Sequence, residues 1–277
     1  MRLCGRCGRG WPRRSCSRAL CAIYFYRDVI FMLASFPSYQ SVGIFIKTDS
    51  PQVIEVLALA DLDFLVLDAE HAPFDRASLD RMLFAARALD VPMLVRVPDQ
   101  RDATILNVLD LGADGIVVPH VDSAEHAREV VAAARFIGGR RGISLSARFG
   151  GYGTRSRQEA IAEADQNMIV CQIESAAALE NVEAIAAVAG VGALLIGRSD
   201  LALSMGEDDP AGSVIMAAVD RIVAAARANG LPVVMVCANR AEAQEFAAKG
   251  ASVFVVGSDQ SMLRNAAKKL RADFPRG

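Results

Sequence analysis

The chain has 277 residues, of which 53% are hydrophobic and 6% aromatic, and its formal net charge is −2. This length allows one α/β barrel domain or two small domains, and the excess of aliphatic side chains is typical of parallel strands covered by alanine-rich helices. Residues 1–31 carry a net charge of +6, so residues 32–277 carry −8. An acidic body argues against nucleic acid as a partner, because it would repel the phosphates.

Residues 1–38 are predicted to be an N-terminal extension outside the fold, and residues 39–277 a single barrel domain. Four cysteines, Cys4, Cys7, Cys16 and Cys21, have the spacing C-x2-C-x8-C-x4-C, which could bind zinc. The arginine-rich, acid-poor composition is also compatible with a transit peptide. We favour a poorly ordered extension, upstream of a start at Met32.

Two further cysteines, Cys171 and Cys237, lie in apolar runs and are expected to be buried thiols. This usage does not resemble the disulfide framework of a secreted protein and favours the cytoplasm. The apolar run at residues 19–26 is interrupted by Arg27 and Asp28, so no membrane association is expected.

A rhythm of short apolar runs and helical stretches begins at residue 42. The predicted strands are Val42–Ile46, Phe64–Asp68, Met93–Val97, Gly115–Pro119, Met168–Ile173, Ala193–Gly197, Val233–Cys237 and Ser252–Gly257. None alternates strictly between polar and apolar residues, which indicates strands buried on both faces, as in a parallel sheet.

Helical periodicity separates these runs. Ser50 and Pro51 begin one helix as its cap and first turn, and further helices are predicted at Ser78–Asp90, Ser123–Phe136, Ser175–Ala189, Ala211–Gly230 and Arg240–Gly250. Residues 136–167, rich in glycine and arginine, are predicted to be a long irregular connection.

The alternation of eight strands with helices predicts a (β/α)8 barrel. A doubly wound open sheet is the alternative, although no G-x-G-x-x-G motif follows the first strand.

Polar residues collect where the predicted strands end, which is where barrel enzymes place their chemistry. Glu174 and Asp200 follow neighbouring strands, and two adjacent carboxylates require a proton or a cation between them. Two hard oxygen donors suit Mg²⁺ or Mn²⁺, with water and substrate completing the coordination. The pair is therefore predicted to hold a divalent metal.

Arg96 ends a buried strand, so its guanidinium needs an anion, either a neighbouring carboxylate or a substrate. His71 can move a proton near neutral pH, and His120 is a weaker candidate. A metal, an arginine and a histidine together indicate enolate chemistry. Lys47 is the sole lysine near a strand end, so a Schiff-base aldolase is less favoured.

The motifs DAEHAPFD, LVRVP, ILNVLDLGADGIVVPHV, RRGIS, QIES and IGRSDLALSMG resemble the HpcH/HpaI aldolase family over residues 40–265. This family comprises metal-dependent class II pyruvate aldolases, including 2-keto-3-deoxy sugar acid and 4-hydroxy-2-oxoheptanedioate aldolases. The resemblance implies reversible cleavage of a 4-hydroxy-2-oxo acid to pyruvate and an aldehyde. It implies Mg²⁺ or Mn²⁺, with Co²⁺ as a further option and no organic cofactor, and a homo-oligomer, with a hexamer favoured.

The resemblance also assigns roles to single residues. It makes His71 the catalytic base, Arg96 the residue that stabilises the enolate, Glu174 and Asp200 the metal ligands, Gln172 a substrate contact, the backbone at Ser199 and Asp200 the carboxylate cradle, and Asp110 the acid that raises the basicity of the histidine. Asp110 lies near the end of its helix that should face the barrel floor, so we expect it to serve the site of a neighbouring subunit.

Two departures from the family pattern concern the aldehyde half of the substrate. Gly197-Arg198-Ser199 replaces the usual Gly-Pro lead-in, and Arg198 could bind a second substrate carboxylate or form a salt bridge. The stretch FIGGRRGIS lacks the usual Tyr-Pro-Pro lead-in.

Three other functions are alternatives to a pyruvate aldolase. They are a citrate-lyase-like or malyl-CoA-lyase-like enzyme, a non-catalytic barrel that binds a keto acid, and a phosphate-binding isomerase, which would need a glycine-rich cradle after strands seven and eight.

Overall fold

The computed structural model describes residues 40–274. The predictions for the N-terminal segment, including its zinc and transit-peptide alternatives and the start at Met32, concern residues outside this range. The domain boundary at residue 38 therefore stays a prediction.

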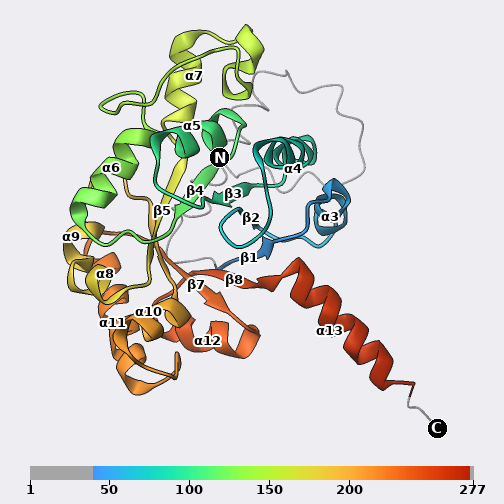
Figure 1. The fold of residues 1–277 in the computed structure, drawn as a ribbon, viewed down its shortest axis with the longest axis vertical. Helices are drawn as coiled ribbons and strands as arrows, with labels where there is room; N and C mark the ends of the chain where they lie inside the picture. Colours follow the sequence, from blue (N-terminus) through green and yellow to red (C-terminus); the bar gives the residue numbers. More distant parts are fainter. Residues whose placement is uncertain (1–39, 275–277) are drawn as a thin grey trace, which may run out of the picture.

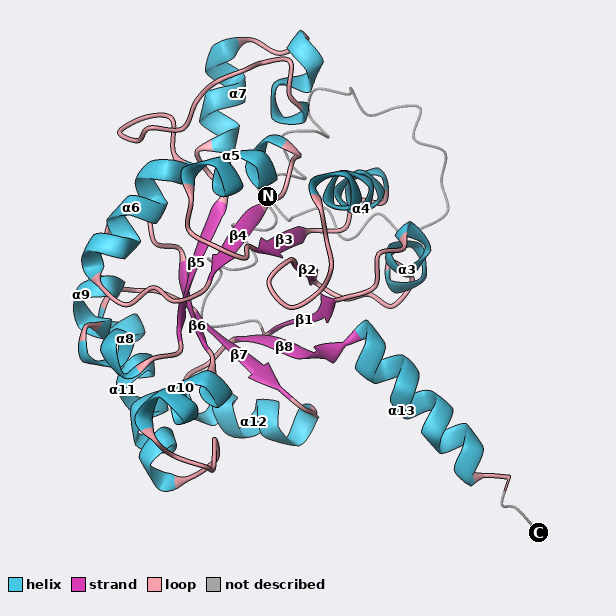
Figure 2. Ribbon diagram, viewed as in Figure 1, coloured by secondary structure: helices cyan, strands magenta, loops and turns pink. Residues whose placement is uncertain are grey.

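Eight parallel strands close into a barrel in chain order, β1 to β8, and helices cover the outside (Figures 1 and 2). The strands are β1 (Ser41–Ile46), β2 (Phe64–Asp68), β3 (Met93–Arg96), β4 (Gly115–Val118), β5 (Met168–Ile173), β6 (Ala193–Ile196), β7 (Val233–Cys237) and β8 (Val253–Ser258). No bound differs from its predicted position by more than one residue. The (β/α)8 prediction is confirmed.

The helices alternate with the strands. They are α3 (Pro51–Leu57), α4 (Arg76–Ala88), α5 (Asp102–Asp110), α6 (Ala124–Ala134), the 3-10 turn η1 (Arg148–Gly153), α7 (Arg157–Ala164), α8 (Ala176–Glu180), α9 (Val182–Ala186), α10 (Arg198–Met205), α11 (Ser213–Ala228), α12 (Arg240–Lys249) and α13 (Asp259–Ala272). The helix predicted from Ser78 begins earlier, because Asp75 and Ser78 form a reciprocal capping box at its start.

Two helix predictions need correction. The single helix expected at Ser175–Ala189 is broken at Asn181, whose side-chain amide donates to the carbonyl oxygen of Asp122 at 3.0 Å. The connection at residues 136–167 is not irregular throughout, because it contains η1 and α7. A small cluster that includes Phe149 and Ala160 holds this excursion together.

The apolar core has two parts, which explains why the strands do not alternate in polarity. Inward-facing residues such as Val66, Val170 and Val255 fill the barrel, and a larger cluster that includes Ile46 and Leu194 lies between the strands and the helices. The carboxyl ends of the strands are left as the place where polar side chains can meet.

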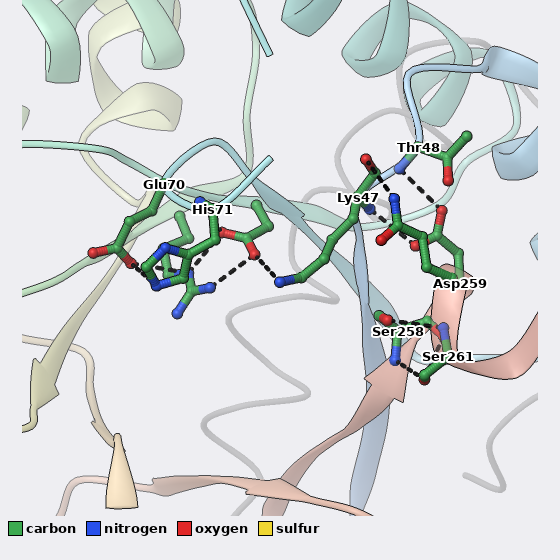
Figure 3. A network of polar contacts seen from close by, with 10 residues as sticks. Lys47, Thr48, Glu70, His71, Ser258, Asp259 and Ser261 are labelled. Atoms are coloured by element: carbon green, nitrogen blue, oxygen red, sulfur yellow. Dashed lines mark hydrogen bonds and ion pairs between the residues drawn. The ribbon is translucent and has the colours of Figure 1, made fainter. Parts of the chain in front are cut away.

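Helix α13 projects away from the barrel (Figure 1) and buries none of its residues. Four large apolar side chains in and just after it are exposed: Met262, Leu263, Leu270 and Phe274. Its first residue is nevertheless anchored, because the Asp259 carboxylate accepts hydrogen bonds from the backbone N–H groups of Lys47 and Thr48, each at 3.0 Å (Figure 3). Within residues 40–274, no helix has the length and apolar character needed to cross a membrane.

Candidate active site

Arg96 ends β3 beside Asp68, which ends β2 and is its register partner. Arg96 Nε donates to Asp68 Oδ1 at 2.9 Å, and Arg96 Nη2 lies 2.8 Å from Asp68 Oδ2. The guanidinium also stacks over the Phe45 ring, 4.6 Å from its centroid. Its side chain is 9% exposed, and it lines the cleft at the barrel mouth. The anion required by this arginine is therefore a neighbouring carboxylate, and the side chain remains part of the cleft wall.

The carboxylate of Asp68 binds two cationic side chains, Arg96 and Lys47, which together form the cationic cluster of the site. Burial by itself would raise the pKa of its carboxyl group, but the hydrogen bond and charge of Arg96, with a further hydrogen bond from Lys47, lower the pKa to about 2. Lys47 Nζ lies 2.9 Å from Asp68 Oδ2, and the backbone N–H of His71 donates to Asp68 Oδ1 at 3.1 Å (Figure 3). Asp68 thus fixes an arginine, a lysine and the turn that carries the histidine.

Glu70, His71, His120 and Glu174 form a second group beside Arg96. Glu70 Oε2 lies 3.3 Å from Arg96 Nε and 3.7 Å from His71 Nε2 (Figure 3). Its other oxygen, Oε1, lies 3.7 Å from His120 Nε2. Burial raises the pKa of Glu70, as does the charge of Glu174, against the opposing charges of Arg96 and the two histidines. The carboxylates of Glu70 and Glu174 therefore lie near each other. His120 contacts both, and His71 contacts Glu70.

Glu174 follows β5 and is 3% exposed. Its Oε1 accepts a hydrogen bond from the backbone N–H of His120 at 2.8 Å and lies 3.2 Å from His120 Nδ1. Its Oε2 accepts from the side-chain amide of Gln172, which is itself buried. The Gln172 Oε1 atom is buried without a hydrogen-bond partner among residues 40–274. An unpartnered buried acceptor at the end of a barrel strand is suited to a group that enters from the cleft.

Gly197 leaves room for Glu174. A Cβ atom at Gly197 would lie 2.8 Å from the Glu174 Cβ and 3.0 Å from its Oε2, so a side chain would collide with the carboxylate. Ser199 and Asp200 follow in the first turn of α10 and are exposed. Both line a cleft of about 470 Å³, together with His71, Arg96 and Gln172.

The structure thus brings His71, Arg96, Gln172, Ser199 and Asp200 to one cleft and places Glu174 against Gln172 and Gly197. Within residues 40–274, no group of three or more His, Cys, Asp or Glu side chains forms a preformed metal cage. The predicted pair, Glu174 and Asp200, supplies only two protein ligands and would leave other positions to water and substrate.

Asp110 is not among the residues that line this cleft. It is the last residue of α5, and its Oδ1 lies 2.9 Å from Nη2 of Arg141, a buried arginine that also stacks on Phe136 and Phe149. The expected separation of Asp110 from the site of its own chain agrees with this position. Its role for a neighbouring subunit stays a prediction.

Four residues of the site have no role assigned from the sequence: Lys47, Asp68, Glu70 and Glu242. Asp68 and Glu70 stand at a predicted strand end, so position alone singles them out, but their pairing with Arg96 is a tertiary contact. Glu242 lines the cleft from α12, 44 residues away in sequence from its partner Arg198. No local pattern marks Glu242 as part of the site, and the position of Lys47 after the first strand does not reveal its contact with Asp68.

Comparison with known proteins identifies the family of this chain. The family model described as HpcH/HpaI aldolase/citrate lyase matches residues 41–266. The chain belongs to the HpcH/HpaI aldolase/citrate lyase family. The resemblance seen in the motifs is therefore confirmed, as is the prediction of an enzyme of the aldolase and lyase type.

Three similar proteins illustrate the likeness. The chain is 37% identical over 236 residues to a 5-keto-4-deoxy-D-glucarate aldolase of Klebsiella pneumoniae subsp. pneumoniae, covering 84% of this chain and 91% of the relative. An HpcH/HpaI aldolase/citrate lyase family protein from Burkholderia cenocepacia superposes with a TM-score of 0.84 at 28% identity, over 89% of this chain and 98% of the other. The citrate synthase SbnG superposes with a TM-score of 0.77 at 27% identity, over 85% and 93%.

Proposed function

We propose that this HpcH/HpaI enzyme is a metal-dependent aldolase that reversibly cleaves a 4-hydroxy-2-oxo acid to pyruvate and an aldehyde. The observation that carries the proposal is the placement of Arg96. Its guanidinium is almost fully buried, is held rigidly by Asp68 and Phe45, and faces a cleft that also contains His71 and Asp200. A preorganised cation at this position can stabilise the negative oxygen of a pyruvate enolate.

Glu174 and Asp200 would hold the divalent ion. Their hard oxygen donors suit Mg²⁺ or Mn²⁺, with Co²⁺ also possible, and no organic cofactor is proposed. One observation supports the fit: Gln172 Oε1, on the side chain that donates to Glu174, is a buried acceptor without a partner within residues 40–274. When bound, the ion would add Lewis-acid stabilisation of the enolate oxygen.

The chain's own residues would handle the proton and the charge. In the cleavage direction, His71 accepts the proton of the 4-hydroxyl group, directly or through water, as the bond between C3 and C4 breaks. The electron pair moves onto the oxygen at C2, where Arg96 faces it, and the enolate is then protonated at C3 to give pyruvate. Glu70, with Oε2 at 3.7 Å from His71 Nε2, is placed to orient the imidazole.

The lyase alternative that acts on a CoA thioester is less well supported. Such an enzyme needs free basic groups for the nucleotide, and residues 136–167 contain five arginines that could supply them: Arg140, Arg141, Arg148, Arg155 and Arg157. Four of these are already paired: Arg140 with Asp102 and Glu129, Arg141 with Asp110, Arg148 with Asp80, and Arg155 with Glu163. Turnover of CoA thioesters, compared with turnover of free 4-hydroxy-2-oxo acids, distinguishes the two enzymes.

Proton exchange of pyruvate in deuterated water tests the proposal and separates it from a non-catalytic barrel that binds a keto acid. An aldolase should move deuterium into the methyl group in the presence of Mg²⁺ or Mn²⁺, and chelation by EDTA should abolish the exchange. Absence of exchange with every metal would favour the binding protein. Because curated relatives are named 5-keto-4-deoxy-D-glucarate aldolases, this six-carbon dicarboxylate is the first substrate to test for cleavage.

We further propose a homo-oligomer, with a hexamer favoured. Helix α13 supports this, because its exposed apolar residues would be costly in water and its Arg264, Lys268, Lys269 and Arg271 complement the acidic body of a second copy. Light scattering after size exclusion would measure the mass, and Leu263→Glu and Leu270→Glu together should shift it to that of a smaller species. A monomeric wild type would reject the proposal.

A cytoplasmic location is also proposed. Cys171 and Cys237 are buried free thiols, and burial raises the pKa of each to about 12. Such thiols are compatible with a reducing compartment. Fractionation of the producing cells tests the location.

A further inference from the structure

Arg198 occupies one wall of the cleft and has not been used in the chemistry above. It is the first residue of α10, directly after Gly197, and its side chain is 14% exposed. The guanidinium stacks over the ring of Phe246 in α12, 4.6 Å from the centroid. Its Nη2 donates to Glu242 Oε1, and both Arg198 and Glu242 line the cleft.

Most donors of this guanidinium are unused. Of its nitrogen atoms, only Nη2 makes a hydrogen bond within residues 40–274. The other two cationic side chains of the cleft, Arg96 and Lys47, both bind Asp68, and Arg96 is assigned above to the enolate oxygen. A largely buried arginine that lines a cleft and keeps N–H groups without a partner is suited to bind a carboxylate through two parallel hydrogen bonds.

The pair is also preorganised. Glu242 Oε2 accepts from the backbone N–H of Ala238 at 2.6 Å, and the Glu242 N–H donates to the Asn239 side chain at 3.1 Å, so Glu242 is fixed at the start of α12. Glu242 and Phe246 therefore hold the Arg198 guanidinium in one orientation without occupying all of its donors. An incoming anion need not displace Glu242, but it does meet the repulsion of that charge.

The position of Arg198 separates it from the reacting centre. Arg96 lies at the end of β3, and Arg198 follows β6, three strands away around the barrel. The cleft volume of about 470 Å³ is in the range that encloses ligands larger than a three-carbon acid. A substrate whose enolate half faces Arg96 can therefore extend its other end toward β6 and α12.

We propose that Arg198 determines specificity for the aldehyde half of the substrate, by binding a carboxylate at the end remote from the cleaved bond. The inference rests on the proposed aldolase function and narrows its substrate class to oxo acids with a second, distal carboxylate. Glu242 sets the selectivity of the same subsite. Its negative charge repels any anion that does not form hydrogen bonds with the N–H groups of Arg198 that Glu242 leaves unpaired.

The test compares aldehydes that differ only in the distal charge. Wild type and Arg198→Met are assayed for addition of pyruvate to two matched pairs, glyoxylate with glycolaldehyde and succinic semialdehyde with 4-hydroxybutanal. Methionine keeps the apolar contact with Phe246 and removes the charge. The preference for the carboxylated member of at least one pair, measured as the ratio of kcat/KM, should fall about 10- to 100-fold, as expected for loss of a charge-assisted hydrogen bond.

Two further variants sharpen the result. Glu242→Gln should raise the same ratio, because it removes the negative charge beside the guanidinium. Arg221→Met is the matched control: it breaks another arginine–glutamate pair, with Glu183, whose residues do not line the cleft. That control should leave the ratio unchanged.

Pyruvate proton exchange, measured on the same samples, separates the possible failures. If wild type and Arg198→Met both exchange deuterium but the ratio is the same in both for each pair, Arg198 does not read the distal end and the inference is wrong. If Arg198→Met loses exchange together with turnover of every aldehyde, the residue serves the pyruvate half or the fold, which also overturns the inference. A wild type without exchange rejects the aldolase function itself.

Discussion

Replacing Asp68 with asparagine tests whether one buried carboxylate holds the cationic cluster of the site. The side chain of Asp68 has no exposed surface, and its partners are Arg96 at 2.8 Å and Lys47 at 2.9 Å. Asparagine keeps the shape but removes the charge that neutralises them. Breaking a buried pair in this way leaves Arg96 insufficiently compensated, and we expect a loss of about 2–4 kcal/mol of unfolding free energy at pH 7.

The dependence on pH makes this prediction specific. The folded-state pKa is about 2 and the ordinary value is 3.8, so the ionised carboxylate stabilises the fold by about 2 kcal/mol at neutral pH. Since the folded pKa is the lower one, this stabilisation is complete above about pH 5 and is lost as the pH falls toward 2. About 1 kcal/mol of it should disappear between pH 5 and pH 3.

Urea unfolding followed by circular dichroism at pH 3, 4, 5 and 7 measures the effect. The difference in unfolding free energy between wild type and Asp68→Asn should shrink by about 1 kcal/mol on acidification from pH 5 to pH 3. Asp208→Asn, at an exposed position, serves as the control and should show no such change. A difference between wild type and Asp68→Asn that stays constant or grows in acid would show that the carboxylate is not held ionised by Arg96 and Lys47.

Three further outcomes are expected. Mn²⁺ should raise the melting temperature of the wild type but not of Glu174→Gln, which should also lose pyruvate exchange; equal stabilisation of both by Mn²⁺ would remove Glu174 from the metal site. Asp110→Asn and His71→Ala should each be inactive alone, but mixed oligomers refolded from the two should regain activity, because one intact site then combines residues of two chains; no recovery would contradict a role of Asp110 in the neighbouring site. Burial raises the pKa of Asp114 to about 6, so its ionisation destabilises the fold progressively from about pH 4 to pH 6. Asp114→Asn, whose amide oxygen can still accept from the Met93 N–H, should therefore raise stability at pH 7 by about 1–3 kcal/mol in urea titrations and be neutral at pH 3; no gain at pH 7 would show that Asp114 is stable as a carboxylate.

The strands could be predicted from the sequence almost to the residue, because a doubly buried parallel strand is a short apolar run that ends abruptly at a polar group. The same abrupt ends located His71, Arg96, Glu174 and Asp200, since parallel strands bring their carboxyl ends to one rim. The helical break at Asn181 was not predictable, because it depends on a carbonyl oxygen 59 residues away.

The pairings inside the site were also beyond the sequence. The sequence left open whether Arg96 binds a carboxylate of the protein or one of the substrate. The register of β2 and β3 decides this, because it places Asp68 beside Arg96. The salt bridge of Arg198 was one of two options in the sequence, and only the position of α12 supplies Glu242 and Phe246 as its neighbours. Residue types at strand ends are thus predictable from order along the chain, whereas the partners that orient them depend on distances between elements.

Asp259, the first residue of α13, connects this helix to the buried charged residues at the barrel mouth. The backbone of Lys47 is held by Asp259, while its side chain reaches Asp68 (Figure 3). A group attached to the carboxyl end of the chain that displaces the start of α13 would therefore also disturb the turn after β1, because Asp259 binds the backbone there. Preparations tagged at that end should be compared with tag-free protein before any kinetic constant is assigned to the native enzyme.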